Sequence, residues 1–265
     1  MEELAYSLHL GSDKNRKNIS RKNGKNNISG NTSLSNNAIQ NARQLSKSKV
    51  DKHNYRKYDN EQALIEIVRG TSSPFEDVKK LYLNEFEEAR LEYNSKQARL
   101  SRMIDNYFEN ISNNEKKDLA CEIIIELGDK EYWDTKDENF KKKMTNVYTK
   151  QVYDLELLAP NFKVASAIIH YDETSPHMHI VGVPIKYKNK SGMEKQVGKS
   201  DVFTKESLKT LQDKMRTLCI EEFNQEYNLD HSLKQKQKGR NKDIHISDMD
   251  NYIQMKKQIE KIPKT

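Results

Sequence analysis

The chain has 265 residues, of which 34% are hydrophobic, so it can bury one large core while keeping an extensive solvated surface. Its net charge of +6 favours a polyanionic partner such as nucleic acid, although a soluble basic protein without such a partner has the same balance. The cysteines, Cys121 and Cys219, form no CxxC pair, which excludes a thiolate zinc knuckle and a dithiol redox motif. No apolar run reaches the roughly 18 residues of a membrane span, and no signal peptide is evident. We therefore expect a cytoplasmic protein with no membrane insertion.

The N-terminal part begins with a strand and continues as a basic segment. Residues 5–10, AYSLHL, alternate in polarity and predict the first strand. Residues 11–57 then contain twelve Lys or Arg, two Asp and ten Asn, and residues 7–54 contain no aromatic side chain of Phe, Trp or Tyr. Because such a segment buries little surface, we expect a basic mobile loop at about residues 11–52. It could clamp a nucleic-acid backbone, or it could be a solvated insertion.

Helices and strands follow in an order that indicates the fold class. Apolar side chains at three- and four-residue steps predict three helices, over residues 75–107, 140–158 and 205–227. Apolar runs predict three further strands, over residues 121–127, 162–170 and 177–185. Because only six residues join the last two strands, these should form an antiparallel pair. The order predicts an α+β domain with a central, mostly antiparallel sheet flanked by helices.

Three of the seven histidines lie within residues 170–179, which read HYDETSPHMH. His177 and His179 are two positions apart in a predicted strand, so both side chains leave the same face of the sheet. His170 ends the preceding strand, and pairing of the two strands brings it beside them. Separate burial of three imidazoles is costly, whereas one divalent cation satisfies all three. Three protein ligands with open coordination positions are typical of a catalytic metal site.

Two acidic residues and a basic stretch extend this prediction. Asp172 and Glu173 lie between the histidines, and either could bind the ion or orient a histidine through its second ring nitrogen. The alternative is a polar surface turn without a metal. No HExxH or PCxxC motif is present, and VGKS at residues 197–200 lacks the glycine spacing of a phosphate loop. We expect this stretch to be a basic loop in which Lys195 and Lys199 touch phosphates.

HYDETSPHMH resembles the third motif of the Mob/Pre family, also called MobV relaxases, in which HxDExxPHxH has six fixed positions, all filled here. These proteins belong to the HUH endonucleases, named for two histidines that flank a hydrophobic residue. KHNYR, residues 52–56, resembles the family's first motif, in which a histidine is followed by Asn and, three residues on, Arg. Residues 63–71, ALIEIVRGT, are the candidate for the second motif. The resemblance implies an HUH relaxase-like fold and a role in plasmid mobilisation.

The resemblance also implies a reaction, in which one DNA strand is nicked at an origin of transfer and remains attached through its 5′ phosphate. It implies that His53 is the nucleophile, with Arg56 lowering the pKa of that histidine. Mn²⁺ or Mg²⁺ would be held by the three histidines, and Glu173 would act beside the ion as a ligand or an orienting base. Tyrosine is the nucleophile of other HUH enzymes, so three tyrosines stay as alternatives: Tyr6, Tyr55 and Tyr58.

The implied partner is origin-of-transfer DNA, a hairpin with a single-stranded flank, in the bacterial cytoplasm. The expected DNA contacts are Lys52, Arg43, Asn54, Lys195 and Lys199. A coupling protein of a conjugation system is a further expected partner, and a homodimer is left open. We expect a relaxase domain over residues 1–230, and a basic tail with the start of a C-terminal helical region over residues 231–265. A non-catalytic DNA-binding protein on this fold, or a metal-dependent phosphodiesterase that uses water, is the alternative.

Overall fold

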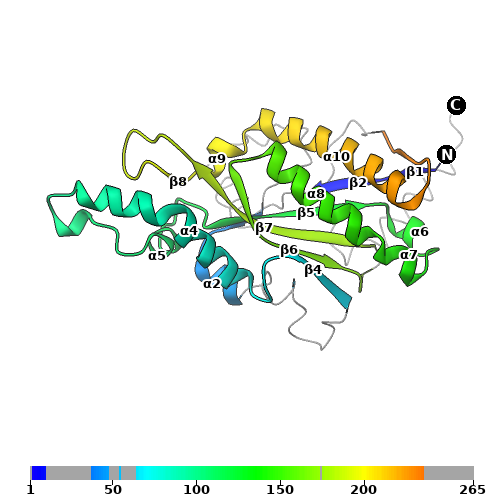
Figure 1. The fold of residues 1–265 in the computed structure, drawn as a ribbon, viewed down its shortest axis with the longest axis horizontal. Coiled ribbons are helices and arrows are strands. Elements are labelled where there is room, and N and C mark those ends of the chain that lie inside the picture. The colour runs from blue at the N-terminus through cyan, green and yellow to red at the C-terminus, as the bar shows by residue number, and fades with distance from the viewer. Residues whose placement is uncertain (1, 10–36, 48–53, 55–63, 174, 236–265) are drawn as a thin grey trace, which may run out of the picture. The chain divides into compact units, whose positions relative to one another are not determined.

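The computed structural model describes residues 2–9, 37–47, 54, 64–173 and 175–235 of the chain (Figure 1). The chain divides into two units, Met1–Gln235 and Lys236–Thr265, and the second lies outside the described residues. The expected domain boundary at residue 230 stays a prediction. In the part of the chain that the structure describes, no helix combines the length and the apolar character that a membrane span requires.

A central antiparallel sheet with the strand order β2-β5-β7-β6-β4 runs through the first unit. These strands are β2 (Tyr6–His9), β4 (Ile65–Arg69), β5 (Ala120–Leu127), β6 (Phe162–His170) and β7 (His177–Lys186). Two short strands extend it, β3 (Asn37–Ile39) beside β5 and β8 (Gln196–Val197) beside β7. A separate parallel pair joins β1 (Glu3–Leu4) to β9 (Ser232–Leu233). The predicted α+β class and the predicted β6–β7 pair are both confirmed.

The three predicted helices are present, and the third has its predicted bounds, whereas the bounds of the first two differ. The helices around the sheet are α2 (Ala42–Lys47), α4 (Pro74–Ser95), α5 (Tyr107–Ser112), α6 (Lys130–Trp133), α7 (Glu138–Lys142), α8 (Met144–Leu158), α9 (Lys199–Val202) and α10 (Lys205–Tyr227), with a 3₁₀ turn, η2 (Leu100–Arg102). The first predicted helix ends early because the Asn94 side chain bonds both the N–H and the carbonyl of Ile104, which fixes a reversal of the chain. The second is split at Lys143 into α7 and α8.

The two faces of the sheet carry different neighbours. Helices α8 and α10 cover one face, where Ile123, Ile125 and Met178 lie in a fully buried core (Figure 1). Side chains alternate along a strand, so the intervening residues of β5 and β7 point to the opposite face. There α4 and α5 cover one end of the sheet, with Phe86 and Val181 in a second core. The rest of that face carries the histidines of β6 and β7.

Part of the expected mobile basic loop is ordered, which corrects that prediction. Residues 37–47 form β3 and α2, and their Ile39 and Leu45 side chains are buried in the core beside α4. Two well-placed apolar side chains anchor this stretch although its average composition is polar, and the backbone of Ile39 accepts a hydrogen bond from Leu119 at 2.7 Å. Residues 10–36 and 48–53 lie outside the described residues.

Candidate metal centre

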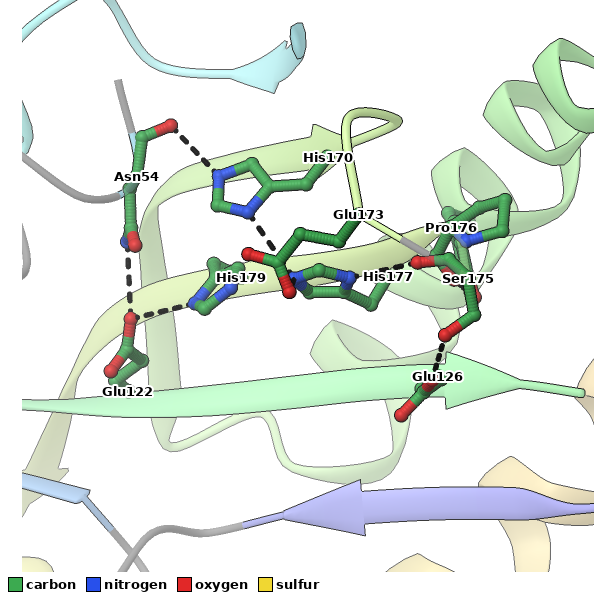
Figure 2. A network of polar contacts seen from close by, with 10 residues as sticks. Asn54, Glu122, Glu126, His170, Glu173, Ser175, Pro176, His177 and His179 are labelled. Atoms are coloured by element: carbon green, nitrogen blue, oxygen red, sulfur yellow. Dashed lines mark hydrogen bonds and ion pairs between the residues drawn. The ribbon is translucent and has the colours of Figure 1, made fainter. Parts of the chain in front are cut away.

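Three histidines meet on the face of the sheet that α8 and α10 leave uncovered, as the sequence predicted. His170 stands opposite His177 in the register of β6 and β7, and His179 lies two residues further along β7. One ligand atom from each ring lies within 4.8 Å of the others, and His170 Nδ1 is 3.2 Å from His177 Nε2. All three residues are buried, with at most 8% of any of them exposed. The rings therefore face one shared point (Figure 2).

A hydrogen bond at its second nitrogen orients each ring (Figure 2). His170 Nε2 donates to the backbone oxygen of Asn54 at 2.9 Å, and His177 Nδ1 donates to that of Ser175 at 3.0 Å. His179 Nδ1 lies 3.0 Å from Glu122 Oε1. Because an acceptor faces each of these nitrogens, each carries the ring proton, and the opposite nitrogens have the basic lone pairs that a metal requires.

The donor set and the spacing of His170 and His177 both fit a divalent transition-metal ion. Nitrogen ligands about 2.1 Å from one ion are about 3.0–3.4 Å apart at octahedral or tetrahedral angles, which agrees with the 3.2 Å between His170 and His177. Neutral imidazoles are common ligands of such ions, whereas Mg²⁺ prefers oxygen. Three protein ligands would leave coordination positions for a substrate or for water.

The turn that precedes His177 is anchored from α8 by Tyr148. The fully buried Tyr148 hydroxyl donates to the carbonyl of Pro176 at 2.7 Å and accepts from the backbone N–H of Leu127 at 3.1 Å. Beside it, the Ser175 hydroxyl donates to the carboxylate of Glu126. Burial raises the pKa of Glu126, and the hydrogen bond from Ser175 opposes that shift. These contacts hold the turn and thereby the start of β7.

Glu122 is a site residue that the sequence reasoning missed. Its side chain is 9% exposed on β5, and it accepts a hydrogen bond from His179, so it forms a carboxylate–histidine pair behind the ligand cluster. A signal was available, because Glu122 and Glu126 alternate within the apolar run CEIIIEL and therefore share a face of the strand. Buried carboxylates require partners, and here a histidine is that partner for Glu122.

The two predicted acidic residues of the turn lie nearer to solvent. The Glu173 side chain is 47% exposed, and its Oε2 is 3.7 Å from His177 Nε2. This distance is too long for a hydrogen bond but places the carboxylate at the open side of the cluster. Asp172 is half-buried in the same turn. Its predicted role beside the histidines stays a prediction, while Glu122 and two backbone carbonyls accept from the second ring nitrogens.

Asn54 was expected to contact DNA, and the structure corrects this. Its side chain is 1% exposed, and Nδ2 donates to Glu122 Oε1 at 3.1 Å. A buried amide with a carboxylate partner does not reach a nucleic acid, so Asn54 belongs to the structure around the histidines. The predicted nucleophile His53, and with it Lys52 and Arg56, lie outside the described residues.

The predicted phosphate-binding lysines have partners inside the protein. The expected basic loop forms β8 and α9 instead, because Val197 packs into the core beside α4. Lys199 Nζ pairs with Asp118 at 3.0 Å, and Lys195 pairs with Glu85 of α4. Each lysine would exchange a carboxylate for a phosphate in order to bind DNA. Arg43 is exposed on α2, and its contact with DNA stays a prediction.

An antiparallel sheet that presents a histidine–hydrophobe–histidine strand, with a third histidine beside it, is the arrangement expected of an HUH relaxase-like fold. The family model of Mob_Pre, described as plasmid recombination enzyme, matches residues 39–241. The chain belongs to the Mob_Pre family, which confirms the resemblance drawn from its two motifs.

Two solved structures of the MobM relaxase domain (MOBV; Mob_Pre), Mn-bound and in complex with a 22-nucleotide pMV158 oriT DNA at pH 5.5 and pH 4.6, share the fold. Each has a TM-score of 0.51 and 20% identity, over 82% of this chain and 97% of the other. Comparison with curated protein sequences gave no significant match.

Proposed function

We propose that this protein is a metal-dependent relaxase that nicks one strand of plasmid DNA at an origin of transfer and keeps that strand on a histidine. The observation that carries the proposal is the convergence of His170, His177 and His179, each with its second nitrogen bonded to an acceptor. A protein that only binds DNA does not require three oriented imidazoles with open coordination positions.

His170, His177 and His179 would hold the ion, for which we propose Mn²⁺ and, as a weaker alternative, Mg²⁺. When bound, the ion would neutralise charge on a non-bridging phosphate oxygen and stabilise the negative charge of the transition state. The Mn-bound MobM relaxase domain, which has the same fold, supports this choice. Glu122 and the backbone of Asn54 keep two of the rings in the orientation that ligation needs.

We propose His53 as the nucleophile, as its place in the KHNYR motif implies. A neutral imidazole nitrogen would form a bond to phosphorus while the bond from phosphorus to the 3′ oxygen breaks, and that oxygen would take up a proton. Arg56 would favour the neutral form of His53 by its positive charge. Glu173, whose carboxylate stands 3.7 Å from His177, would act beside the ion as a ligand or an orienting base.

For partners we propose origin-of-transfer DNA with a hairpin and a single-stranded flank, by analogy with the pMV158 oriT DNA bound by the MobM relaxase domain. Arg43 and Lys52 would contact phosphates, and binding would weaken with salt. A coupling protein and a homodimer are further proposals, and so is a relaxase domain that ends near residue 230.

The test is a nicking assay on supercoiled plasmids that carry candidate origins, with pMV158 oriT as one of them. Open-circular product with protein trapped on the 5′ end, abolished by EDTA and restored by Mn²⁺, would support the proposal. Binding without nicking would indicate the non-catalytic alternative, and nicking without an adduct would indicate attack by water. His53→Ala should form no adduct, whereas persistence of the adduct in this variant would exclude His53 as the nucleophile.

A further inference from the structure

Two of the three candidate ligands are connected to each other by a chain of hydrogen bonds behind the metal point. His179 Nδ1 is 3.0 Å from Glu122 Oε1, and the same oxygen accepts from Asn54 Nδ2 at 3.1 Å. The backbone oxygen of Asn54 in turn accepts from His170 Nε2 at 2.9 Å. The contacts therefore run from β7 through β5 and residue 54 to β6, and they close into a ring where the two histidines face one point (Figure 2).

Every member of this ring is buried, which makes its hydrogen bonds strong and specific. Asn54 and His170 are at most 1% exposed, and the side chains of Glu122 and His179 are 9% and 5% exposed. A carboxylate at such a position is stabilised by donors, and Glu122 Oε1 receives two of them. The amide of Asn54 is one of the two, so it limits the positions that Glu122 can occupy.

Metal binding and the ring of contacts should strengthen each other. A metal ion on an imidazole makes the opposite N–H a better donor and fixes the plane of the ring. Ligation by His170 and His179 would thus strengthen both contacts that lead to residue 54. By thermodynamic reciprocity, a well-held Asn54 raises the affinity of the site for its metal by the same factor.

We infer that Asn54 is a positioning residue that couples occupancy of the metal site to the position of the backbone at residue 54. This inference rests on the proposed function for its significance, because residue 54 directly follows the predicted nucleophile His53 in the sequence. Asn54 would then act without contacting DNA. The KHNYR motif would supply both the proposed nucleophile, His53, and a buried amide that supports the metal site.

The first test measures Mn²⁺ affinity by calorimetry on the full-length, DNA-free protein. Asn54→Ala should weaken Mn²⁺ binding by about tenfold, the lower end of the range for residues that support ligands. Glu122→Gln should weaken it as well, and the double variant should fall short of the product of the two effects, because both changes break the same link. Asn189→Ala is the matched control. Its amide also donates two hydrogen bonds, to the carbonyls of Lys186 and Glu194, but it lies in the turn after β7, and Mn²⁺ affinity should not change.

The second test reads the coupling at residue 54 itself. Hydrogen exchange of the peptide that contains Asn54 should slow when Mn²⁺ is added to the wild-type protein. In Asn54→Ala at saturating Mn²⁺, most of that difference should disappear. A general loss of stability would lower the melting temperature but would not remove a metal-dependent difference in one peptide.

The inference would be overturned if Asn54→Ala bound Mn²⁺ within twofold of the wild type while His179→Ala lost binding. It would equally be overturned if Mn²⁺ left exchange at Asn54 unchanged in the wild type. If Asn54→Ala does not fold, Mn²⁺ affinity is measured on Glu122→Gln instead. The glutamine side chain has the size of glutamate and keeps one acceptor oxygen. Neither measurement uses DNA, so failure of nicking and failure of this coupling are separate results.

Discussion

Removal of one hydroxyl, in Tyr148→Phe, should destabilise the protein and weaken the metal site together. The Tyr148 hydroxyl bonds the carbonyl of Pro176 and the N–H of Leu127 in a fully buried position. A buried polar group that loses its partner costs about 1–3 kcal/mol, so the two groups together should cost about 2–6 kcal/mol of unfolding free energy. In a domain of this size each kcal/mol lowers the melting temperature by about 2–4 °C. We therefore expect the melting temperature to decrease by roughly 4–24 °C.

Urea denaturation and thermal melts of the metal-free protein measure this change. Tyr153→Phe is the matched control, because it makes the same substitution in α8 at a side chain that is 57% exposed, and it should alter stability by less than about 0.5 kcal/mol. Since Pro176 precedes His177, Tyr148→Phe should also weaken Mn²⁺ binding. If Tyr148→Phe were as stable as the control, the argument that this hydroxyl anchors the turn would be refuted.

Three further predictions concern pH, packing and metal. Burial, followed by the hydrogen bond with Asp154, raises the pKa of Glu222 from 4.5 to about 8. Between these two pH values the folded state holds a proton that the unfolded state releases, so this residue's contribution to stability should decline as the pH rises from about 4.5 to 8. Glu222→Gln should flatten that decline in a pH series of urea denaturation curves. In Gly182→Ala the new Cβ would lie 2.5 Å from Phe162 Cζ and 2.6 Å from a backbone oxygen of β6. We therefore expect the free energy of unfolding to fall by about 1–3 kcal/mol, and an unchanged melting temperature would contradict this. Mn²⁺ at a hundred times its Kd should stabilise the wild-type protein by about 2.7 kcal/mol, EDTA should reverse this, and His179→Ala should show no response in the same thermal melt.

Local sequence determined the cluster of three histidines. The strands around residues 170–179 are strongly apolar, only six residues join them, and a two-residue period places His177 and His179 on one face. These rules act over a few residues, so the convergence of the three histidines required no knowledge of the rest of the fold. The motif HxDExxPHxH, together with KHNYR, was sufficient to indicate the family, which the match over residues 39–241 confirms.

The hydrogen-bond partners behind these histidines were decided by the tertiary structure. Glu122 is 57 residues from His179 and 68 from Asn54 in sequence, and only the placement of β5 beside β7 brings its carboxylate to the ring. The sequence predicted a surface position for Asn54, because its neighbours in sequence are polar and basic. Its burial arises from contacts with His170, which is 116 residues away. Local patterns determine which face a side chain takes, whereas the partners of a buried polar group depend on which distant strands pair, and that is settled by packing of the whole sheet.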